Sequence, residues 1–356
     1  MLRKRIEKIQ EILDNNTAAI ISDDSNRLYF TGFNSSAGMV VITKNGAWFF
    51  IDFRYIEKAK STVSHMSVIL AEKLLSQLKE LFENQNIRNI LLETDRINLD
   101  FYGSLKEKFQ GVNISLEKNL TKKIAYLRSI KTEEEKELIK KAQSLTDKTF
   151  DYILNYIERG KTEKEIMLLM EFYIRKMGSE GVSFDFIVVS GNNSSLPHGV
   201  PTDKPITDGD FITMDFGAVV SGYRSDMTRT VALKYVTDKQ RKVYETVLSA
   251  QKSALDAIKP DVKCCEIDKI ARDLIYNAGY EGCFGHGLGH SVGIEIHENP
   301  SFNTRDETKL QKGMVLTVEP GIYLENEFGV RIEDMVYITD NSYENLTRSN
   351  KELIIL

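Results

Sequence analysis

Four acidic residues occur within or at the ends of apolar segments that have the composition of β-strands. The segments are 211–217 with Asp215, 226–231 beginning at Asp226, 314–319 ending at Glu319, and 330–336 with Glu333. A buried, ionised carboxylate without a partner costs several kcal/mol, so each side chain requires a cation or strong hydrogen-bond donors. Taken singly, each acid is explained by a neighbouring base at a strand end or a turn. A shared cation is the explanation that covers all four.

The histidines strengthen the second explanation because they are unevenly placed. His65 lies in the N-terminal third of the chain, whereas His198, His286, His290 and His297 lie in the C-terminal half with the four acids. Histidine is the usual metal ligand and proton carrier near neutral pH. One histidine with four carboxylates is a hard, oxygen-rich ligand set that suits Mn, Co or Mg, and carboxylates can bridge two metals about 3.5–4 Å apart. The pattern indicates a hydrolase with a paired-metal site.

Residues two positions away along each strand share a face with the acids and are candidate hydrogen-bond partners. The expected neighbours are Thr213 for Asp215, Thr228 for Asp226, Thr317 for Glu319 and Arg331 for Glu333. The glycine-rich segment 285–290 is a poor phosphate loop, because His290 stands where a third glycine is required and no lysine follows. Cys283 is a poor nucleophile, because a carboxylate-rich site raises the pKa of a thiol.

Local patterns predict two domains. A length of 356 residues favours roughly two domains. Between residues 15 and 121 short apolar runs alternate with helical patterns, which is typical of an α/β domain, and 122–131 form a basic connector. Capping boxes beginning at Thr132, Thr162 and Thr237 predict helices, and 184–190, 211–219, 226–233, 314–319 and 330–338 resemble strands. We expect an α+β fold with domains at 1–125 and 132–356.

Composition excludes several classes of protein. The 47 basic and 52 acidic residues give a net charge of −5, so we expect no nucleic-acid or anionic-membrane partner. No apolar run approaches the roughly 18 residues of a membrane span, and the N-terminus lacks the apolar core of a signal peptide. Three cysteines, two of them adjacent, form no readable disulfide framework. Cytoplasmic residence is the expectation.

Five motifs in order resemble the signature of the pita-bread metallopeptidases, the creatinase, aminopeptidase P and prolidase family. The motifs occupy residues 214–217 (MDFG), 225–230 (SDMTRT), 285–298 (GHGLGHSVGIEIHE), 318–323 (VEPGIY) and 330–334 (VRIED). Residues 28–33 (LYFTGF) and 52–55 (DFRY) look like the creatinase-type N-terminal domain of the Xaa-Pro branch. The resemblance implies a C-terminal pita-bread catalytic domain preceded by a smaller α/β domain.

The resemblance also assigns roles to residues. The five metal ligands would be Asp215, Asp226, His290, Glu319 and Glu333, with Asp226 and Glu333 bridging two divalent ions, most often Mn, with Co or Zn as alternatives. A water ionised by the two ions would attack the scissile carbonyl, and Glu319 would take and pass on its proton. His297 would steady the oxyanion and His198 would contact the scissile amide or leaving amine. His198, His286, His297, Tyr323 and Arg331 are the expected substrate-binding residues.

Proline-containing peptides are the implied substrates. An Xaa-Pro bond lacks the N–H that ordinary proteases read, so it requires a dedicated pocket. We expect an Xaa-Pro aminopeptidase, with an Xaa-Pro dipeptidase as the alternative; the dipeptidase requires a block beyond the proline carboxylate, usually a cation. A non-catalytic peptide-binding scaffold of the same fold is a more remote alternative. The resemblance further implies a homodimer in which the N-terminal domain completes a neighbour's pocket.

Overall fold

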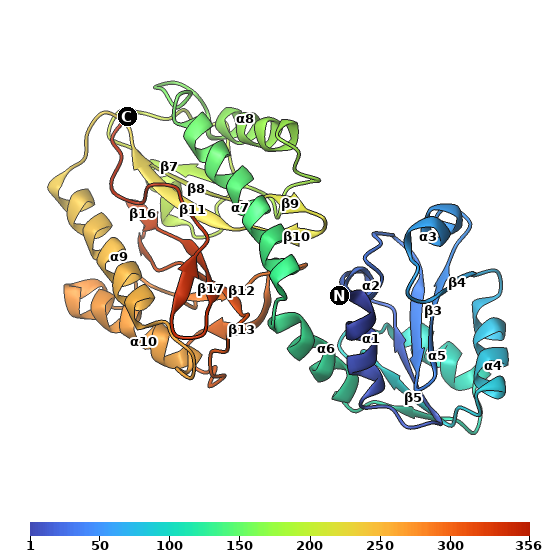
Figure 1. Cartoon of the computed structure of the whole chain (residues 1–356). Helices are drawn as coiled ribbons and strands as arrows, with labels where there is room; N and C mark the ends of the chain where they lie inside the picture. The colour runs from blue at the N-terminus through green and yellow to red at the C-terminus, as the bar shows by residue number, and fades with distance from the viewer. The chain divides into compact units, whose positions relative to one another are not determined.

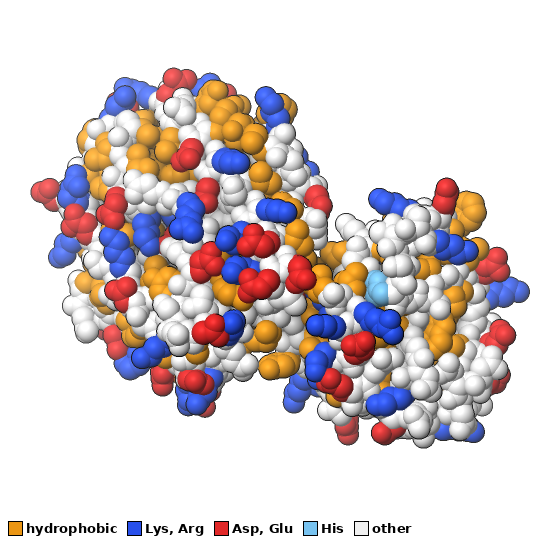
Figure 2. Space-filling view, viewed as in Figure 1, with side chains coloured by type: hydrophobic (Ala, Val, Ile, Leu, Met, Phe, Trp, Pro, Cys, Tyr) orange, Lys and Arg blue, Asp and Glu red, His pale blue; other side chains and the backbone are white.

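The computed structural model describes the whole chain, residues 1–356, and divides into two compact units, Met1–Arg128 and Ser129–Leu356 (Figure 1). None of its helices combines the length and the apolar character that crossing a membrane requires. On the face drawn in Figure 2, acidic and basic side chains are interspersed and do not gather by sign.

The first unit is built on one six-stranded mixed sheet in the order β4-β3-β2-β1-β5-β6. Its strands are β1 (Thr17–Ile21), β2 (Met39–Thr43), β3 (Gly46–Ile51), β4 (Ser67–Leu70), β5 (Asn89–Leu92) and β6 (Asn113–Ser115). Its helices are α1 (Leu2–Gln10), α2 (Asp24–Thr31), α3 (Ile56–Thr62), α4 (Leu74–Asn84), α5 (Leu99–Lys108) and α6 (Asn119–Ser129). Most of the expected basic connector is therefore helical, because Leu120 and Ile124 give α6 a buried apolar side.

The second unit combines four long helices with several antiparallel sheets. The helices are α7 (Glu133–Ile153), α8 (Glu163–Lys176), α9 (Asp238–Ala257) and α10 (Cys264–Ile275), with single helical turns at Gly191–Ser195 and Tyr276–Tyr280. The strands are β7 (Ile187–Ser190), β8 (Phe211–Phe216), β9 (Val219–Val220), β10 (Tyr223–Arg224), β11 (Met227–Ala232), β12 (Gly289–Ser291), β13 (Glu298–Phe302), β14 (Val315–Val318), β15 (Gly321–Leu324), β16 (Phe328–Arg331), β17 (Asp334–Ile338) and β18 (Tyr343–Asn345). They form sheets β11-β8-β7 and β13-β12-β14-β17-β18 and the pairs β9-β10 and β15-β16.

Capping boxes begin three of the long helices, as the sequence predicts. Thr132, Thr162 and Thr237 each accept a hydrogen bond from a backbone N–H three residues later, and the side chain at that position accepts one from the threonine N–H. Each such cap contributes about 1 kcal/mol to helix stability. The three helices therefore begin at positions fixed by local sequence.

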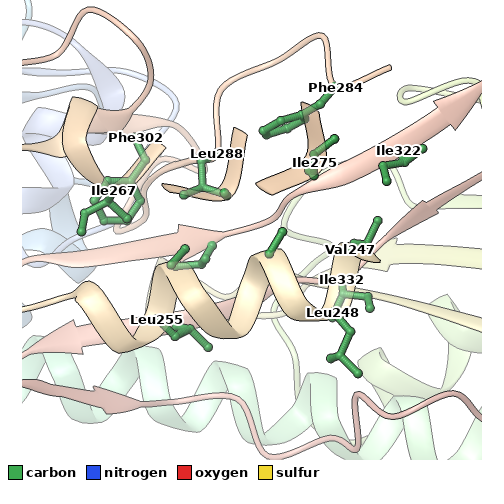
Figure 3. Packing of buried hydrophobic residues seen from close by; sticks show 14 of the residues in the cluster. Val247, Leu248, Leu255, Ile267, Ile275, Phe284, Leu288, Phe302, Ile322 and Ile332 are labelled. Atoms are coloured by element: carbon green, nitrogen blue, oxygen red, sulfur yellow. The ribbon is translucent and has the colours of Figure 1, made fainter. Parts of the chain in front are cut away.

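Two apolar cores hold the strands of the second unit. One lies between α7, α8 and the β11-β8-β7 sheet. The other packs α9 and α10 against the strands that follow residue 286, with Val247, Leu248 and Leu255 of α9 among its members (Figure 3). The strand ends that lie between the two cores bring together residues that are far apart in the sequence.

One predicted strand is wrong in detail. Residues 330–338 form two strands, β16 and β17, because they pair with different partners, β15 and β14. At the break the Glu333 N–H donates to the Thr228 carbonyl at 3.1 Å, outside either ladder. Because Glu333 lies in this break, its side chain does not follow the alternation of a β-strand, which the prediction of its neighbours assumed.

Candidate functional site

The five predicted metal ligands come together in the second unit, where they line one cavity of about 640 Å³. Asp215 lies within β8 and His290 within β12. Asp226 immediately precedes β11, Glu319 immediately follows β14, and Glu333 lies between β16 and β17. Three of the four acids therefore occupy strand ends, where side chains from different sheets can converge.

The distances between these side chains suit a metal centre. One ligand atom each from Asp226, His290 and Glu333 lie within 4.8 Å of one another. His290 Nε2 is 3.5 Å from Asp226 Oδ2 and 3.4 Å from Glu319 Oε1. One ion or a pair of ions could be held by this number of converging donors.

Unpartnered oxygens show that the site fits divalent cations. Asp215 Oδ1, Asp226 Oδ1 and Glu333 Oε1 are buried and have no hydrogen-bond partner. Buried polar atoms are almost always hydrogen-bonded, and a bound ion is one of the established explanations when they are not. Three such oxygens from three carboxylates in one cavity are the donor set that a hard cation prefers.

Threonine hydroxyls orient two of the acids. Thr317 Oγ1 donates to Glu319 Oε1 at 3.2 Å, the pair that strand alternation predicts. Thr228 Oγ1 donates to Glu333 Oε2 at 2.8 Å, whereas the sequence argument paired it with Asp226. The difference follows from the break before β17, which brings Glu333 against β11.

The pKa values of the ionisable groups reflect how closely the buried acids are packed. Burial, followed by repulsion from neighbouring carboxylates, holds the pKa of Asp226 and of Glu333 well above the usual range. Burial raises the pKa of Glu319 to about 8. Burial lowers the pKa of His290 to about 4, so its imidazole is neutral and able to bind a metal at neutral pH. A divalent cation would stabilise the ionised carboxylates.

Arg331 links one of the acids to Tyr323 and to the backbone at Pro197. Its buried guanidinium donates to Asp215 Oδ2 at 2.7 Å, Tyr323 Oη at 2.9 Å and the Pro197 carbonyl at 3.1 Å. Tyr323 Oη is in turn 3.0 Å from His286 Nε2. Strand alternation predicted that Arg331 would lie beside Glu333, but its guanidinium instead donates to Asp215 in β8, a strand of another sheet. These contacts occupy the one guanidinium that lines the cavity.

The three remaining candidate histidines line the cavity, whereas Tyr323, also predicted to bind substrate, is not among the lining residues. His198, His286 and His297 all face it, and the His297 ring lies 4.4 Å from that of His290, measured between centroids. Burial lowers the pKa of His297, so it carries a donor N–H without a positive charge at neutral pH.

An apolar wall is the part of the cavity that sequence reasoning missed. It is formed by Phe184, Phe186, Ile187, Val200 and Ile296. Phe184, Phe186 and Ile187 could not be distinguished from core residues, because 184–190 has the pattern of a buried strand, and Val200 and Ile296 lie outside every predicted strand. The wall gives the cavity room for a compact apolar group beside the acids.

Comparison with known proteins agrees with this arrangement. Residues 137–340 match metallopeptidase family M24, and residues 5–130 match the creatinase/prolidase N-terminal domain. The Xaa-Pro dipeptidase of Pyrococcus furiosus is 38% identical over 99% of this chain and 100% of its own.

Solved structures extend the comparison. An Xaa-Pro dipeptidase from Bacillus anthracis superposes with a TM-score of 0.95 at 37% identity, covering 100% of both chains. An X-Pro aminopeptidase from Thermotoga maritima superposes with a TM-score of 0.91 at 34% identity, covering 98% of this chain and 100% of that one. The expected fold, a pita-bread domain preceded by a creatinase-type domain, is confirmed. The chain therefore belongs to metallopeptidase family M24 and is a metal-dependent peptide hydrolase.

Proposed function

We propose that the protein is an Xaa-Pro dipeptidase that uses two divalent cations. The observation that carries the proposal is the convergence of five ligand-type side chains with three unpartnered carboxylate oxygens in one cavity. The sequence alone favoured the aminopeptidase over the dipeptidase. The relatives favour the dipeptidase, because those from Pyrococcus furiosus and Bacillus anthracis carry that name and match over almost the whole chain.

Asp215, Asp226, His290, Glu319 and Glu333 would together hold the two ions. We propose Mn as the ion, because four carboxylates and one imidazole are a hard donor set; Co and Zn are the alternatives. When bound, such ions lower the pKa of a water and polarise the peptide carbonyl.

The chain's own residues supply proton transfer and orientation. Glu319 takes the proton that the attacking water loses and delivers it to the leaving proline nitrogen. Neutral His297 donates its N–H to the oxyanion that develops on the scissile carbonyl oxygen. His198, which is exposed at the cavity, contacts the scissile amide and orients the leaving amine. The apolar wall accepts the proline ring, which presents no N–H to the enzyme.

The Xaa-Pro aminopeptidase remains a second candidate because of one feature of the cavity. Arg331 is its only Lys or Arg, and that guanidinium already bonds Asp215, Tyr323, Thr228 and the Pro197 carbonyl. The lining therefore offers no spare basic side chain to a proline carboxylate, as strict selection of dipeptides would require. The Thermotoga maritima relative carries the aminopeptidase name.

Other parts of the proposal concern the whole protein. We propose a creatinase-type domain at 1–125 and a catalytic domain at 132–356, a homodimer in solution, and residence in the cytoplasm. Light scattering of the full chain tests the dimer, since a mass near 40.6 kDa would contradict it and twice that mass is expected.

Hydrolysis of three peptides tests the substrate assignment. Protein stripped with a chelator and then given Mn is incubated with Ala-Pro, Ala-Pro-Ala and Ala-Ala-Ala, and released alanine is measured. A dipeptidase cleaves Ala-Pro at least tenfold faster than Ala-Pro-Ala. Preferred cleavage of Ala-Pro-Ala at its Ala-Pro bond would establish the aminopeptidase instead. Absence of metal-dependent cleavage of all three would leave the non-catalytic scaffold.

A further inference from the structure

Glu163, the first residue of α8, is a fully buried carboxylate outside the metal site. Its Oε1 accepts hydrogen bonds from the Ser190 N–H at 2.7 Å and the Ser190 hydroxyl at 2.9 Å. Its Oε2 accepts from the Thr202 N–H at 3.0 Å and the Thr202 hydroxyl at 2.7 Å. Asn193 Nδ2 lies 3.1 Å from both oxygens. One side chain therefore holds two points of the backbone twelve residues apart.

The segment between those points, residues 190–202, carries part of the substrate side of the cavity. It includes His198 and Val200, both of which line the cavity, and the Pro197 carbonyl that accepts from Arg331. Only one short helical turn, Gly191–Ser195, lies within it. Loops hold functional groups only as rigidly as their anchors allow. The position of His198 therefore depends on where the two ends are fixed, together with contacts inside the segment such as the Gly329 N–H donating to the Ser194 hydroxyl at 2.9 Å.

A neighbouring cation reinforces the anchor. Lys204 Nζ donates to the Ser190 hydroxyl at 2.9 Å and pairs with Asp210 at 3.1 Å. The first turn of α8 also joins this region through backbone bonds, from the Lys164 N–H to the Thr202 carbonyl at 3.1 Å and from the Glu163 N–H to the Lys204 carbonyl at 3.2 Å. The helix start and the 190–202 segment therefore form one hydrogen-bonded unit.

We propose that Glu163 is a positioning residue for peptide hydrolysis: it clamps both ends of the 190–202 segment and thereby holds His198 against the scissile amide. This inference rests on the proposed function, because it assigns His198 to the reaction. Glu163 itself does not line the cavity, and its hydrogen-bond partners Ser190, Asn193 and Thr202 are neither lining residues nor predicted metal ligands. It acts through the backbone that it holds.

Glu163→Gln is the informative variant because it keeps the size of the side chain. A glutamine offers one oxygen and one NH₂ group, so in either orientation its NH₂ faces a backbone N–H, that of Ser190 or that of Thr202. Two donors in contact repel, and one end of the segment is released. Displacement of a catalytic group by about 1 Å can cost up to about 100-fold in rate, so we expect kcat for Ala-Pro to fall about 10- to 100-fold with little change in KM.

A double-mutant cycle tests whether the effect passes through His198. The rates of the Mn-loaded wild type, Glu163→Gln, His198→Ala and the double variant are compared. The proposal predicts that Glu163→Gln has little further effect when His198 is already absent. If Glu163→Gln lowers kcat by the same factor in both backgrounds, the positioning role is wrong. If the wild type does not hydrolyse Ala-Pro, the proposed function itself fails, which is a separate result.

Hydrogen exchange tests the proposed clamp independently of catalytic activity. In Glu163→Gln, the amides of residues 191–202 should exchange at least tenfold faster, while those of β8 and β11 and the binding of Mn measured by calorimetry stay unchanged. Unchanged exchange in residues 191–202 would overturn the proposal.

Two further variants provide an alternative test and a control. Thr202→Val removes one donor to Glu163 from an exposed position and should reproduce a smaller loss of kcat, about two- to fivefold, if Glu163→Gln does not fold. Glu165→Gln, in the same helical turn, is the matched control, since glutamine also completes a capping box. A loss in Glu165→Gln equal to that in Glu163→Gln would contradict the proposal, because it would trace the effect to the start of α8 alone.

Discussion

Replacing Glu319 by glutamine should stabilise the metal-free protein although it removes a proposed ligand. Burial raises the pKa of Glu319 to about 8, against an ordinary value of 4.5. Because folding raises the pKa of this carboxyl, its contribution to the free energy of unfolding is fully present only below pH 4.5, the ordinary pKa. The contribution is lost as the pH rises towards 8. Glutamine does not ionise, and its oxygen can still accept the Thr317 hydroxyl.

The magnitude follows from the pKa of Glu319. At pH 7 this carboxyl is ionised in the unfolded chain and protonated in the folded protein. The free-energy cost of folding is therefore set by the difference between pH 7 and the unfolded pKa of 4.5. At about 1.4 kcal/mol for each pH unit this is about 3 kcal/mol. The value is an upper one, because 16% of the side chain still reaches solvent. For a unit of this size it corresponds to a rise in Tm of up to about 6–12 °C.

Scanning calorimetry in a chelating buffer measures the effect at pH 5, 7 and 8. We expect the Tm difference between Glu319→Gln and wild type to be small at pH 5 and to grow towards pH 8. Excess Mn should reverse the order, because wild type gains more from the metal than the variant does. Glu327→Gln, an exposed surface change in the same unit, should alter Tm little under all conditions. A variant less stable than wild type in chelator at pH 8 would refute the reasoning.

Three other predictions test the site and its support. Asp226→Ala should lose Mn binding by calorimetry and turnover of Ala-Pro together while keeping its circular dichroism, and normal activity in it would contradict the ligand assignment. Mn binding at pH 7 should release about one proton or more, since Glu319 is then largely protonated; calorimetry in two buffers of different ionisation enthalpy measures this, and no release would count against the account. Arg229→Ala should lower the free energy of unfolding by about 3–5 kcal/mol, because the 2.7 Å Arg229–Asp334 pair is almost fully buried, and a loss below about 1 kcal/mol in urea titration would contradict it.

The parts of the fold that the sequence predicts are those set by local chemistry. The helices after Thr132, Thr162 and Thr237 begin where their capping boxes stand, because a cap is formed by side chains three residues apart. The break between Arg331 and Glu333 was not predicted. It arises because β16 and β17 pair with different strands, which is a long-range choice without a local signal.

The same difference between local and long-range determinants applies to the candidate site. Scarce residue types in apolar surroundings identified the acids and histidines that the structure brings into one cavity. Their hydrogen-bond partners were only partly foreseen: Thr317 bonds Glu319 as strand alternation predicts, but Arg331 serves Asp215 across strands. Glu163 gave no signal, because in sequence it is one of two acids in the first turn of a helix. Its role depends on contacts with Ser190 and Thr202, which lie 27 and 39 residues later in the chain.

The most direct test of the account follows bound metal and activity in the same sample. Chelator-stripped wild-type protein is titrated with Mn, and Ala-Pro hydrolysis and the number of bound ions are measured at each addition. The account predicts no hydrolysis by the stripped protein, activity that rises with occupancy and levels off at two ions per chain, and none of this in Asp226→Ala. Full hydrolysis by the stripped protein, or activity in Asp226→Ala equal to wild type, would contradict it.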